Sequence, residues 1–372
     1  MTGLSAFKCA GEIPVRSAAD IGVLGPGSPL LREPMLVTDA GRLMTEVWRW
    51  TPAFLRDTVG TTCLQATLPG PDGKFRYEPG RVLDSHPLPV AQFFDDLDRA
   101  DGPRWCVQQI SIERDLPSLA RELDHPCCVP SALINAVNLW LAAPGTVTPL
   151  HYDDTHNLFA QVSGAKTFYL FPPESLDALY PGPLNTGAQH LSRVDLFHPD
   201  LVKHPLAASL SYREVTVRAG EALVLPAFWW HQVVSHDEVS ASVNFWWRAH
   251  VMDCLCPGLM RQLRSTAAQD NLQALAKTFE FGPGEGGDPV QDAAELARLL
   301  SDIGEYRAAA GLSLSILHTL QLQQAASAQA AELLAKFSGL GEPGSLSVQQ
   351  AGQVAQLVDN LIAITSGKEP IW

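Results

Sequence analysis

Between residues 131 and 250 the chain is divided into short β-rich runs at close spacing, and this pattern restricts the possible folds more than any other feature. Turn signals separate the runs, among them the Gly-containing segments 163–165 and 218–220. The runs span residues 133–142, 157–162, 167–171, 214–217, 222–225 and 240–247. Short strands broken by frequent turns are typical of a sandwich or a small barrel. The sequence therefore predicts a mainly β fold for this part of the chain.

The segments on either side have a different character. Residues 1–125 mix short apolar runs with Pro and Gly breaks, and they predict a strand over 33–37 and a helix over 43–55. Beyond about residue 253, Ala, Leu and Gln predominate and no strand is predicted. We therefore expect three parts. They are an irregular α+β region over 1–125, a β core over 126–250 and a helical region over 251–372.

The helical region contains two sets of apolar residues with the spacing i, i+3, i+4, i+7 of an amphipathic helix. They are Leu296, Leu299, Leu300 and Ile303, and then Val354, Leu357, Val358 and Leu361. Ser347 followed by Gln350 resembles a capping box at the start of the last helix, and the Gly-rich run 282–288 predicts a break between helical blocks. No fixed-period repeat is evident, so a bundle or an oligomerisation segment is expected and a solenoid is not.

Composition narrows the class of partner and compartment. With 46% hydrophobic and 18% charged residues the chain can bury a sizeable core. The formal net charge of −14 disfavours nucleic acid and anionic lipid as partners. No stretch reaches the ~18 uninterrupted apolar residues of a membrane span, and no signal-peptide core is present. The 7 cysteines are scattered, which suits a reducing compartment. We expect a cytoplasmic protein without a membrane partner.

The stretch 146–154 contains the pair of residues with the clearest chemical meaning, His151 and Asp153. In an extended chain residues i and i+2 project from the same face, where an imidazole nitrogen and a carboxylate oxygen can bind one metal ion. His231, after a predicted strand and two tryptophans, is the best candidate for a third ligand. Two histidines and one carboxylate leave adjacent positions open, as in non-haem Fe(II) oxygenases. The alternative is a surface histidine beside a turn aspartate.

The spacing around this pair resembles the cupin motifs. The matching positions are Gly145, His151, Asp153, Asn157 and Gly164, and then Gly220, Pro226 and His231. Asp153 stands where many cupins have a second histidine, and Asn157 stands where they have a glutamate. The fuller run 151–166, with 170–173 and 243–246, resembles the JmjC-type hydroxylases, and within them most of all the asparaginyl hydroxylase that inhibits hypoxia-inducible factor. The resemblance covers about residues 130–248 and implies a double-stranded β-helix, or jelly roll.

The resemblance also implies an iron and 2-oxoglutarate site. His151, Asp153 and His231 would bind Fe(II), which 2-oxoglutarate would chelate through its keto acid end, with molecular oxygen as the third reactant. The matching cosubstrate-binding residues are Thr148 and Lys166 at the far carboxylate, Asn157 and Asn244 near the metal, and Trp246 with Trp230 as walls of the pocket. A buried lysine requires such an anion, because desolvation otherwise disfavours the ammonium.

One residue departs from the family pattern, and several other histidines are not expected to bind a metal. Cys106 stands where the asparaginyl hydroxylase has a tyrosine that helps to hold the far carboxylate. Lys166 and Thr148 would then hold it alone, or Tyr152 or Tyr169 would compensate. Five other histidines are expected to be surface or packing residues. They are His156, His190, His198, His204 and His236.

The expected function is hydroxylation of a C–H bond, most of all in a protein or peptide side chain, with demethylation of an N-methyl group less favoured. Residues 189–193 depart from the peptide-contacting positions of the asparaginyl hydroxylase, so asparagine is not implied as the target. Alternative substrates are a small molecule or an RNA base. A rival class is a metal-binding cupin without oxygen chemistry, either an isomerase or a sensor. Related hydroxylases dimerise through C-terminal helices, so a homodimer through part of residues 253–372 is expected.

Overall fold

The structure is a computed structural model of the 372-residue chain. It describes residues 2–248 except 26–27, 76, 79–80, 83–84, 100, 183–187, 189 and 237–238. Its C-terminal part describes residues 294, 297–298, 301, 309–310, 312–314, 316–317, 320, 327–337, 340 and 348–368. The chain divides into two compact units, Met1–Cys254 and Leu255–Trp372, which are taken separately below.

The core of the first unit consists of eight strands that are shared between two facing sheets. They are β9 (Ile134–Ala142), β10 (Val147–His151), β11 (Thr155–Ser163), β12 (Ala165–Phe171), β13 (Ser211–Arg218), β14 (Ala222–Leu225), β15 (Trp230–Ser235) and β16 (Ser240–Arg248). Among the described residues, one sheet has the order β1-β13-β12-β15-β10 and the other contains β14-β11-β16-β9. The chain changes sheet at every step but one, which is the connectivity of a jelly roll. The predicted mainly β, double-stranded β-helix fold is confirmed.

Strands from the N-terminal region lengthen these sheets. They are β1 (Lys8–Cys9), β2 (Val15–Ser17), β3 (Met35–Thr38), β4 (Cys63–Thr67), β7 (Ser85–Pro89) and β8 (Cys106–Ser111), while β5 (Tyr77–Glu78) pairs with β6 (Arg81–Val82). In the described part of the chain the larger sheet has nine strands, with the order β2-β3-β14-β11-β16-β9-β8-β4-β7. Four jelly-roll strands therefore lie in the middle of this larger sheet. The N-terminal region adds strands at both of its edges.

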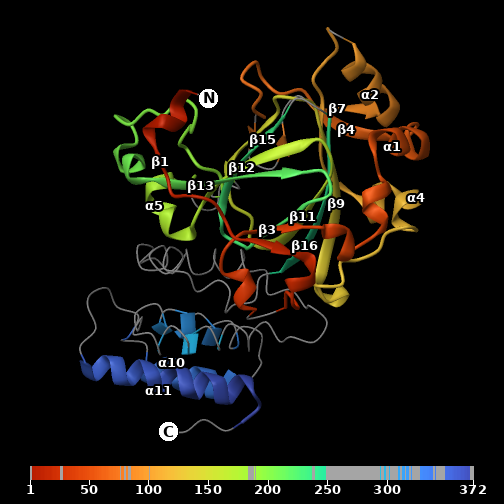
Figure 1. Ribbon diagram of the computed structural model, residues 1–372. Helices are drawn as coiled ribbons and strands as arrows, with labels where there is room; N and C mark the ends of the chain where they lie inside the picture. The colour runs from red at the N-terminus through yellow and green to blue at the C-terminus, as the bar shows by residue number, and fades with distance from the viewer. Residues whose placement is uncertain are drawn as a thin grey trace. The chain divides into compact units, whose positions relative to one another are not determined.

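Helices cover this wider sheet at one end. The α-helices of the first unit are α1 (Pro52–Val59), α2 (Val90–Asp98), α3 (Ile112–Asp115), α4 (Pro117–Ala120) and α5 (Leu176–Leu179). The 3-10 helices are η1 (Thr2–Ala6), η2 (Ala18–Asp20), η3 (Pro29–Leu31), η4 (Ala40–Arg42), η5 (Glu46–Arg49), η6 (Ser131–Leu133), η7 (Pro173–Ser175) and η8 (Pro205–Ser209). Figure 1 shows α1, α2 and α4 together beside β4, β7 and β9, whereas α5 lies near β1 and β13.

Two hydrophobic clusters explain why the central strands are apolar on both faces. On β11, Leu158, Ala160 and Val162 belong to the large cluster that the N-terminal helices share. Phe159, on the other face of the same strand, packs with Phe168 of β12 between the two sheets. Each such strand is therefore buried on both sides, and a polar residue at an inward position needs a specific partner.

The helix predicted over 43–55 is wrong in its bounds. The structure has η5 over Glu46–Arg49 and then α1 over Pro52–Val59. Thr51 between them is extended, because the ring of Pro52 disfavours a helical conformation at the preceding residue. The Oγ1 of Thr51 accepts a hydrogen bond from the backbone N–H of Phe54 at 3.3 Å and caps the new helix. Among the strands, the prediction over 33–37 is confirmed as β3, which begins two residues later and ends one residue later than expected.

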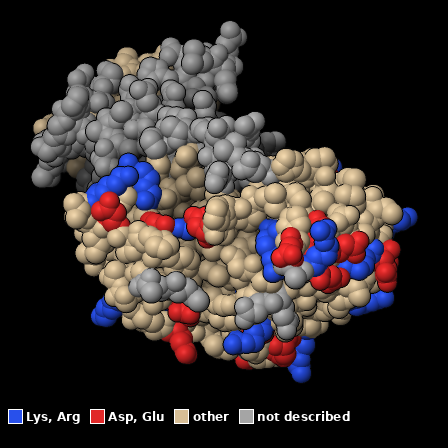
Figure 2. All heavy atoms as spheres, turned by 90° about the horizontal axis from the view of Figure 1, so that it is seen from above, with Lys and Arg blue, Asp and Glu red and all other residues tan. Residues whose placement is uncertain are grey.

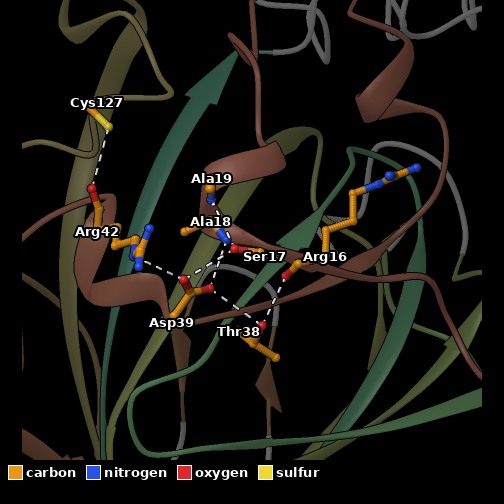
Figure 3. A network of polar contacts seen from close by, with 8 residues as sticks. All are labelled: Arg16, Ser17, Ala18, Ala19, Thr38, Asp39, Arg42 and Cys127. Carbon is orange, nitrogen blue, oxygen red and sulfur yellow. Dashed lines mark hydrogen bonds and ion pairs between the residues drawn. The ribbon is translucent and has the colours of Figure 1, made fainter.

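A network around Asp39 fixes the outer edge of the larger sheet (Figure 3). Asp39 follows β3 with a left-handed backbone, at φ 47°. Its carboxylate accepts hydrogen bonds from the N–H of Ala18 at 2.9 Å and the hydroxyl of Ser17 at 3.2 Å, and it pairs with Arg42 at 3.2 Å. These hydrogen bonds lower the pKa of Asp39. The short parallel strand β2 is thereby tied to the turn that follows β3.

Gly164 shows why the predicted turn between β11 and β12 requires glycine. Its φ is +70°, and a Cβ at this position would lie 2.8 Å from the carbonyl oxygen of Val239. Both the backbone conformation and the close approach therefore exclude other residues. This tight turn sets the register in which β12 leaves β11, and so it fixes the position of Lys166 two residues later.

In the second unit the described helices are α10 (Ser327–Phe337) and α11 (Val348–Thr365). The amphipathic helix predicted around Val354 is confirmed, because the four apolar residues of that set are buried in α11. The set from Leu296 to Ile303, the capping residue Ser347 and the break over 282–288 lie outside the described residues. Within the described residues, no helix combines the length and the apolar character that crossing a membrane requires.

Candidate active site

His151, Asp153 and His231 come together at the end of two paired strands. His151 ends β10 and lies opposite His231 of β15 in the antiparallel register. The Nε2 of His151 is 3.9 Å from one oxygen of Asp153, and the Nε2 of His231 is 3.7 Å from the other. One nitrogen or oxygen from each side chain lies within 4.8 Å of the others, so one metal ion could contact all three. Asp153 lies beyond the end of β10, so His151 and Asp153 do not share one strand as predicted for an extended chain, yet the side chain of Asp153 still converges with the histidines.

Backbone carbonyls hold both imidazoles in the form that binds a metal. The Nδ1 of His151 is 2.7 Å from the carbonyl oxygen of Pro149, and the Nδ1 of His231 is 3.0 Å from that of Trp229. Since a carbonyl can only accept, each Nδ1–H donates and each Nε2 keeps its lone pair. Burial lowers the pKa of both histidines to about 4, so the rings are neutral near pH 7. Burial raises the pKa of Asp153, against the opposing effect of His151.

The loop before His231 is tied to the Asp153 turn and to β11. Phe228 has φ +65°, and its N–H donates to the carbonyl oxygen of Asp153 at 2.8 Å. The N–H of Ala227 donates to the Nδ1 of His156 at 3.1 Å. His156 is 1% exposed and its ring lies against Trp247, so it is a packing residue, as expected. These contacts fix the loop from which the His231 side chain enters the site.

A pocket inside the jelly roll extends from the three candidate ligands. It encloses about 410 Å³ of atom-free space, its open mouth included. Five of the six residues predicted around the cosubstrate line it, namely Thr148, Asn157, Lys166, Asn244 and Trp246. The other lining residues are Gln109, Trp140, Phe159, Phe168 and Val233, together with the three candidate ligands. The structure therefore brings the predicted metal and cosubstrate residues into one cavity.

Lys166 lies in this pocket without a negative partner. Its side chain is 5% exposed, and its ammonium donates to the hydroxyl of Ser242 at 3.0 Å. The same ammonium lies 5.2 Å from the ring centroid of Phe159 and 5.7 Å from that of Trp140. None of the ion pairs between described residues includes Lys166. Burial lowers the pKa of this lysine to about 8. An anion that enters the pocket would remove this unfavourable state.

Further polar atoms of the pocket also lack partners, which tests whether a polar ligand fits it. They are the Oδ1 atoms of Asn157 and Asn244 and the Nε1 atoms of Trp140 and Trp246. Buried polar groups are nearly always hydrogen-bonded, and leaving one unpaired costs about 1–3 kcal/mol. The two indole N–H groups and the ammonium are donors and suit the oxygen atoms of a bound anion, whereas the two amide oxygens accept and need a donor such as a metal-bound water. The three donors fit a keto acid that carries a second carboxylate.

The structure also shows residues that the sequence did not single out for the pocket. Gln109 has φ +49° where the β8–β9 register shifts, at a bulge that turns its side chain toward the cavity. Trp140 reaches the cavity from β9. Neither could be found by spacing, because the bulge and the register between distant strands are not visible in the sequence.

The predicted substitutes for the missing tyrosine lie elsewhere. Tyr152 packs on Phe228 and Trp230, and Tyr169 packs on Phe197 and Tyr212, so neither lines the pocket. Trp230 is also outside its lining, contrary to expectation. Cys106 is buried, and burial raises the pKa of its thiol to about 12. Among the described side chains, therefore, no tyrosine hydroxyl lies at the lysine end of the pocket.

The other four histidines that the sequence singled out occupy packing or surface positions. His204 is buried against Tyr180, His236 contacts the hydroxyl of Thr167 at 2.6 Å, and His198 is exposed. His190 is half-buried, its carbonyl oxygen accepts from the N–H of Tyr152, and burial lowers its pKa. The segment around His190 also pairs with β10 through a bridge between Leu191 and His151. His190 therefore lies at the border of the site and is not one of the three converging side chains.

A jelly roll with two histidines and a carboxylate at one end of an internal pocket defines a cupin-type protein with a candidate metal centre. The family model for a cupin-like domain matches residues 30–253, and the chain belongs to this family, in its JmjC branch. It is 37% identical to the lysine-specific demethylase JMJ31 of Arabidopsis thaliana over 139 residues, which are 37% of this chain and 25% of that protein. It is 33% identical to lysine-specific demethylase 8 of Xenopus tropicalis over 156 residues, 41% of this chain and 34% of that protein.

A third relative is covered over most of its length. The human bifunctional peptidase and (3S)-lysyl hydroxylase JMJD7 is 31% identical over 245 residues, which are 58% of this chain and 77% of that protein. By contrast, the chain spans only about a quarter to a third of the plant and frog relatives. The names of these relatives state different reactions, demethylation in two and hydroxylation and peptide cleavage in one.

Proposed function

We propose that this protein is an Fe(II)- and 2-oxoglutarate-dependent oxygenase that hydroxylates a C–H bond of a protein or peptide side chain. One observation carries the proposal. The same pocket has a His/Asp/His cluster with free Nε2 lone pairs and, further along it, a buried lysine without an anion. A metal-chelating keto acid with a second carboxylate complements both features.

The chain's own residues have distinct tasks in this proposal. His151, Asp153 and His231 would hold Fe(II), which would supply oxygen activation. In the same reaction 2-oxoglutarate would be oxidised by molecular oxygen to succinate and carbon dioxide. Lys166 would bind the far carboxylate, with Thr148 beside it on the pocket wall. The apolar rings and side chains between the two ends exclude water from the site.

A protein side chain is the proposed substrate, for two reasons. The names of the relatives above point to lysine residues in proteins, and the chain's net charge of −14 disfavours RNA. On the face drawn in Figure 2, Lys and Arg side chains lie beside Asp and Glu side chains. An extended phosphate backbone requires a run of cations, whereas a peptide can use such a mixed surface. Hydroxylation is preferred to demethylation because of the motif resemblance alone.

The test is an anaerobic titration of the purified protein with Fe(II) and 2-oxoglutarate. Chelation by the keto acid should produce a weak visible charge-transfer band. Lys166→Ala should lose the band at limiting 2-oxoglutarate, whereas Lys203→Ala, at an exposed lysine, should keep it. If metal binds and the wild-type protein shows no band, the proposal fails and a cupin without oxygen chemistry replaces it.

We also propose that the chain forms a homodimer through helices in residues 253–372. The support is the resemblance to hydroxylases with C-terminal dimerisation helices and the presence of the long helix α11. Light scattering after size exclusion should give the mass of two chains for the full-length protein and of one for a chain that ends at residue 252. Equal oligomeric states would contradict this proposal.

The proposed compartment is the reducing cytoplasm. The five cysteines that the structure describes are free, including the adjacent Cys127 and Cys128. Free thiols at exposed positions such as Cys9 and Cys63 suit a reducing environment. Fractionation of the source cells, with the protein followed by antibody, tests this assignment, and recovery outside the cytoplasmic fraction would contradict it.

A further inference from the structure

A second pocket of the first unit lies outside the candidate active site, between α1, α2 and three loop segments. We call it the helix pocket. It encloses about 890 Å³ of atom-free space, its open mouth included, compared with about 410 Å³ for the pocket that contains Lys166. The two pockets have no lining residue in common. A cavity of this size is in the range that small-molecule ligands occupy, and the proposed oxygenase reaction does not use it.

Two helices that lie side by side form one wall of the helix pocket (Figure 1). The lining positions are 52, 53 and 56 on α1 and 94, 97 and 98 on α2. Residues three and four apart share one face of a helix, so each helix turns one face toward the pocket. Phe94 is buried in the hydrophobic core, whereas Ala53 is exposed. The pocket therefore extends from the surface down to the core.

The opposite wall is formed by chain segments at the ends of three strands. Arg104 precedes β8, Pro144 follows β9 and Val239 precedes β16. Each of these strands also contributes residues to the pocket that contains Lys166. The helix pocket is therefore built on the same strands as the candidate active site, but from different residues.

Most of the lining is apolar and offers few hydrogen bonds. Six of the nine lining side chains are hydrocarbon, and two of them belong to Pro52 and Pro144, which have no backbone N–H to donate. An extended peptide has polar backbone groups at every residue, and each needs a partner when it is buried. The lining therefore suits a compact apolar body better than it suits a peptide backbone.

The charged side chains of the lining leave one positive charge without a partner. Arg56 pairs with Asp98 at 3.0 Å and with Asp95 at 3.2 Å, and its guanidinium lies 5.6 Å from the ring centroid of Phe94. The side chain of Arg104, by contrast, has no ion pair or hydrogen bond with any other described residue. A guanidinium is always protonated and binds carboxylate-like anions through two N–H groups. Arg104 is therefore the group of the lining that an anion would contact.

We propose that the helix pocket binds a small organic anion that consists of an apolar aryl or alkyl body and one carboxylate or sulfonate. The apolar body lies against Phe94 and Leu97, and the anionic end binds the guanidinium of Arg104. This site is independent of the proposed oxygenase function, because it shares no residue with the pocket that contains Lys166.

The probe for this site is 8-anilinonaphthalene-1-sulfonate, whose fluorescence increases in an apolar environment. Its uncharged counterpart is N-phenyl-1-naphthylamine, which has the same rings and lacks the sulfonate. Both are titrated into the full-length protein, and the sulfonate should bind more tightly. Arg104→Gln should weaken the sulfonate about 5-fold, as expected for an exposed charge pair, and should change the affinity of the amine by less than about 2-fold. Arg121→Gln, at an exposed arginine outside the pocket, is the matched control and should change neither.

A second variant blocks the pocket without altering its charge. Ala53→Trp places a large ring at an exposed lining position and should remove most of the fluorescence increase with both probes. Added salt should weaken the sulfonate in the wild type more than in Arg104→Gln, since salt screens an exposed charge. Octanoate, an alkyl carboxylate, should displace the sulfonate from the wild type.

Several outcomes would overturn the proposal. They are a wild-type protein that binds neither probe, or probe affinities that Ala53→Trp leaves unchanged. Equal weakening of both probes by Arg104→Gln would refute the anion contact, since it would indicate that the arginine acts through packing. Displacement of the sulfonate by a capped acidic peptide with apolar residues, and not by octanoate, would replace the small anion with a protein partner.

Discussion

Replacement of Lys166 by Met is expected to stabilise the protein in the absence of ligands. Burial lowers the pKa of this lysine from 10.5 to about 8. At 1.36 kcal/mol per pKa unit, this difference corresponds to about 3 kcal/mol of unfavourable free energy for the charged form. Met has a similar length and no charge, and its introduction forfeits the hydrogen bond to Ser242, worth about 1 kcal/mol. The expected net gain at pH 7 is therefore about 2 kcal/mol.

The gain has a definite dependence on pH. Below pH 8 the lysine is protonated in both the folded and the unfolded chain, so the full cost of burying the charge is present. Between pH 8 and 10.5 the unfolded chain keeps this proton and the folded chain releases it. The unfolded state then binds more protons, and the stability of the wild type rises with pH. The advantage of Lys166→Met should therefore shrink as the pH rises from 8 toward 10.5.

The assay is urea unfolding of the ligand-free protein at pH 7 and pH 10, followed by tryptophan fluorescence. Eight of the nine tryptophans lie within residues 1–254, so the signal reports mainly on the unit that contains the pocket. Lys203→Met, at an exposed lysine, is the matched control and should change stability little. A Lys166→Met protein that is less stable than the wild type at pH 7, or whose advantage is the same at both pH values, would refute the reasoning.

Three further predictions concern the site and its supports. Ala at His151 or Asp153 should abolish 2-oxoglutarate turnover, measured as succinate release, and turnover at the wild-type rate would refute the ligand assignment. Gln109→Gly should raise the free energy of unfolding by about 1 kcal/mol in a urea titration, because φ +49° is strained for Gln. A loss of stability would contradict this prediction, since it would show that the Gln side chain stabilises the fold by more than the backbone strain costs. His156→Leu should leave the N–H of Ala227 unpaired and weaken metal binding about 10-fold in a metal titration, while His156→Asn, whose Oδ1 takes the place of Nδ1, should restore much of it. Identical metal affinities in the two His156 variants would contradict that positioning role.

The three candidate ligands could be predicted because two of them are close in sequence and all three are chemically distinctive. His151 and Asp153 converge even though β10 ends at His151, since the turn keeps both side chains on the same side. The partner of His151 across the sheet is His231, which the sequence suggested through its neighbours and the structure places in register. Local spacing and chemistry thus sufficed for the cluster, whereas the exact strand bounds did not follow from them.

Other features depended on contacts that sequence patterns do not encode. Trp140 and Ser242 are a hundred residues apart, and only the β9–β16 register places them beside the same lysine. Gln109 reaches the pocket because of a bulge, and no glycine near it in the sequence indicates that bulge. The break before α1 is a different case, because Pro52 is visible in the sequence and disfavours a helix that continues through Thr51. That boundary could have been predicted, while the other two could not.

The polar residues of the pocket are informative because of the strands in which they occur. The strands β11, β12 and β16 are buried on both faces, so the polar end of an Asn or Lys side chain within them cannot be hydrated by solvent. Asn157, Lys166 and Asn244 each destabilise the ligand-free chain, through unpaired amide oxygens or an unpaired charge. Apolar residues at these positions would give a more stable barrel. An anion at the lysine end removes the cost at Lys166, so a substitution there that stabilises the ligand-free chain should weaken binding of that anion.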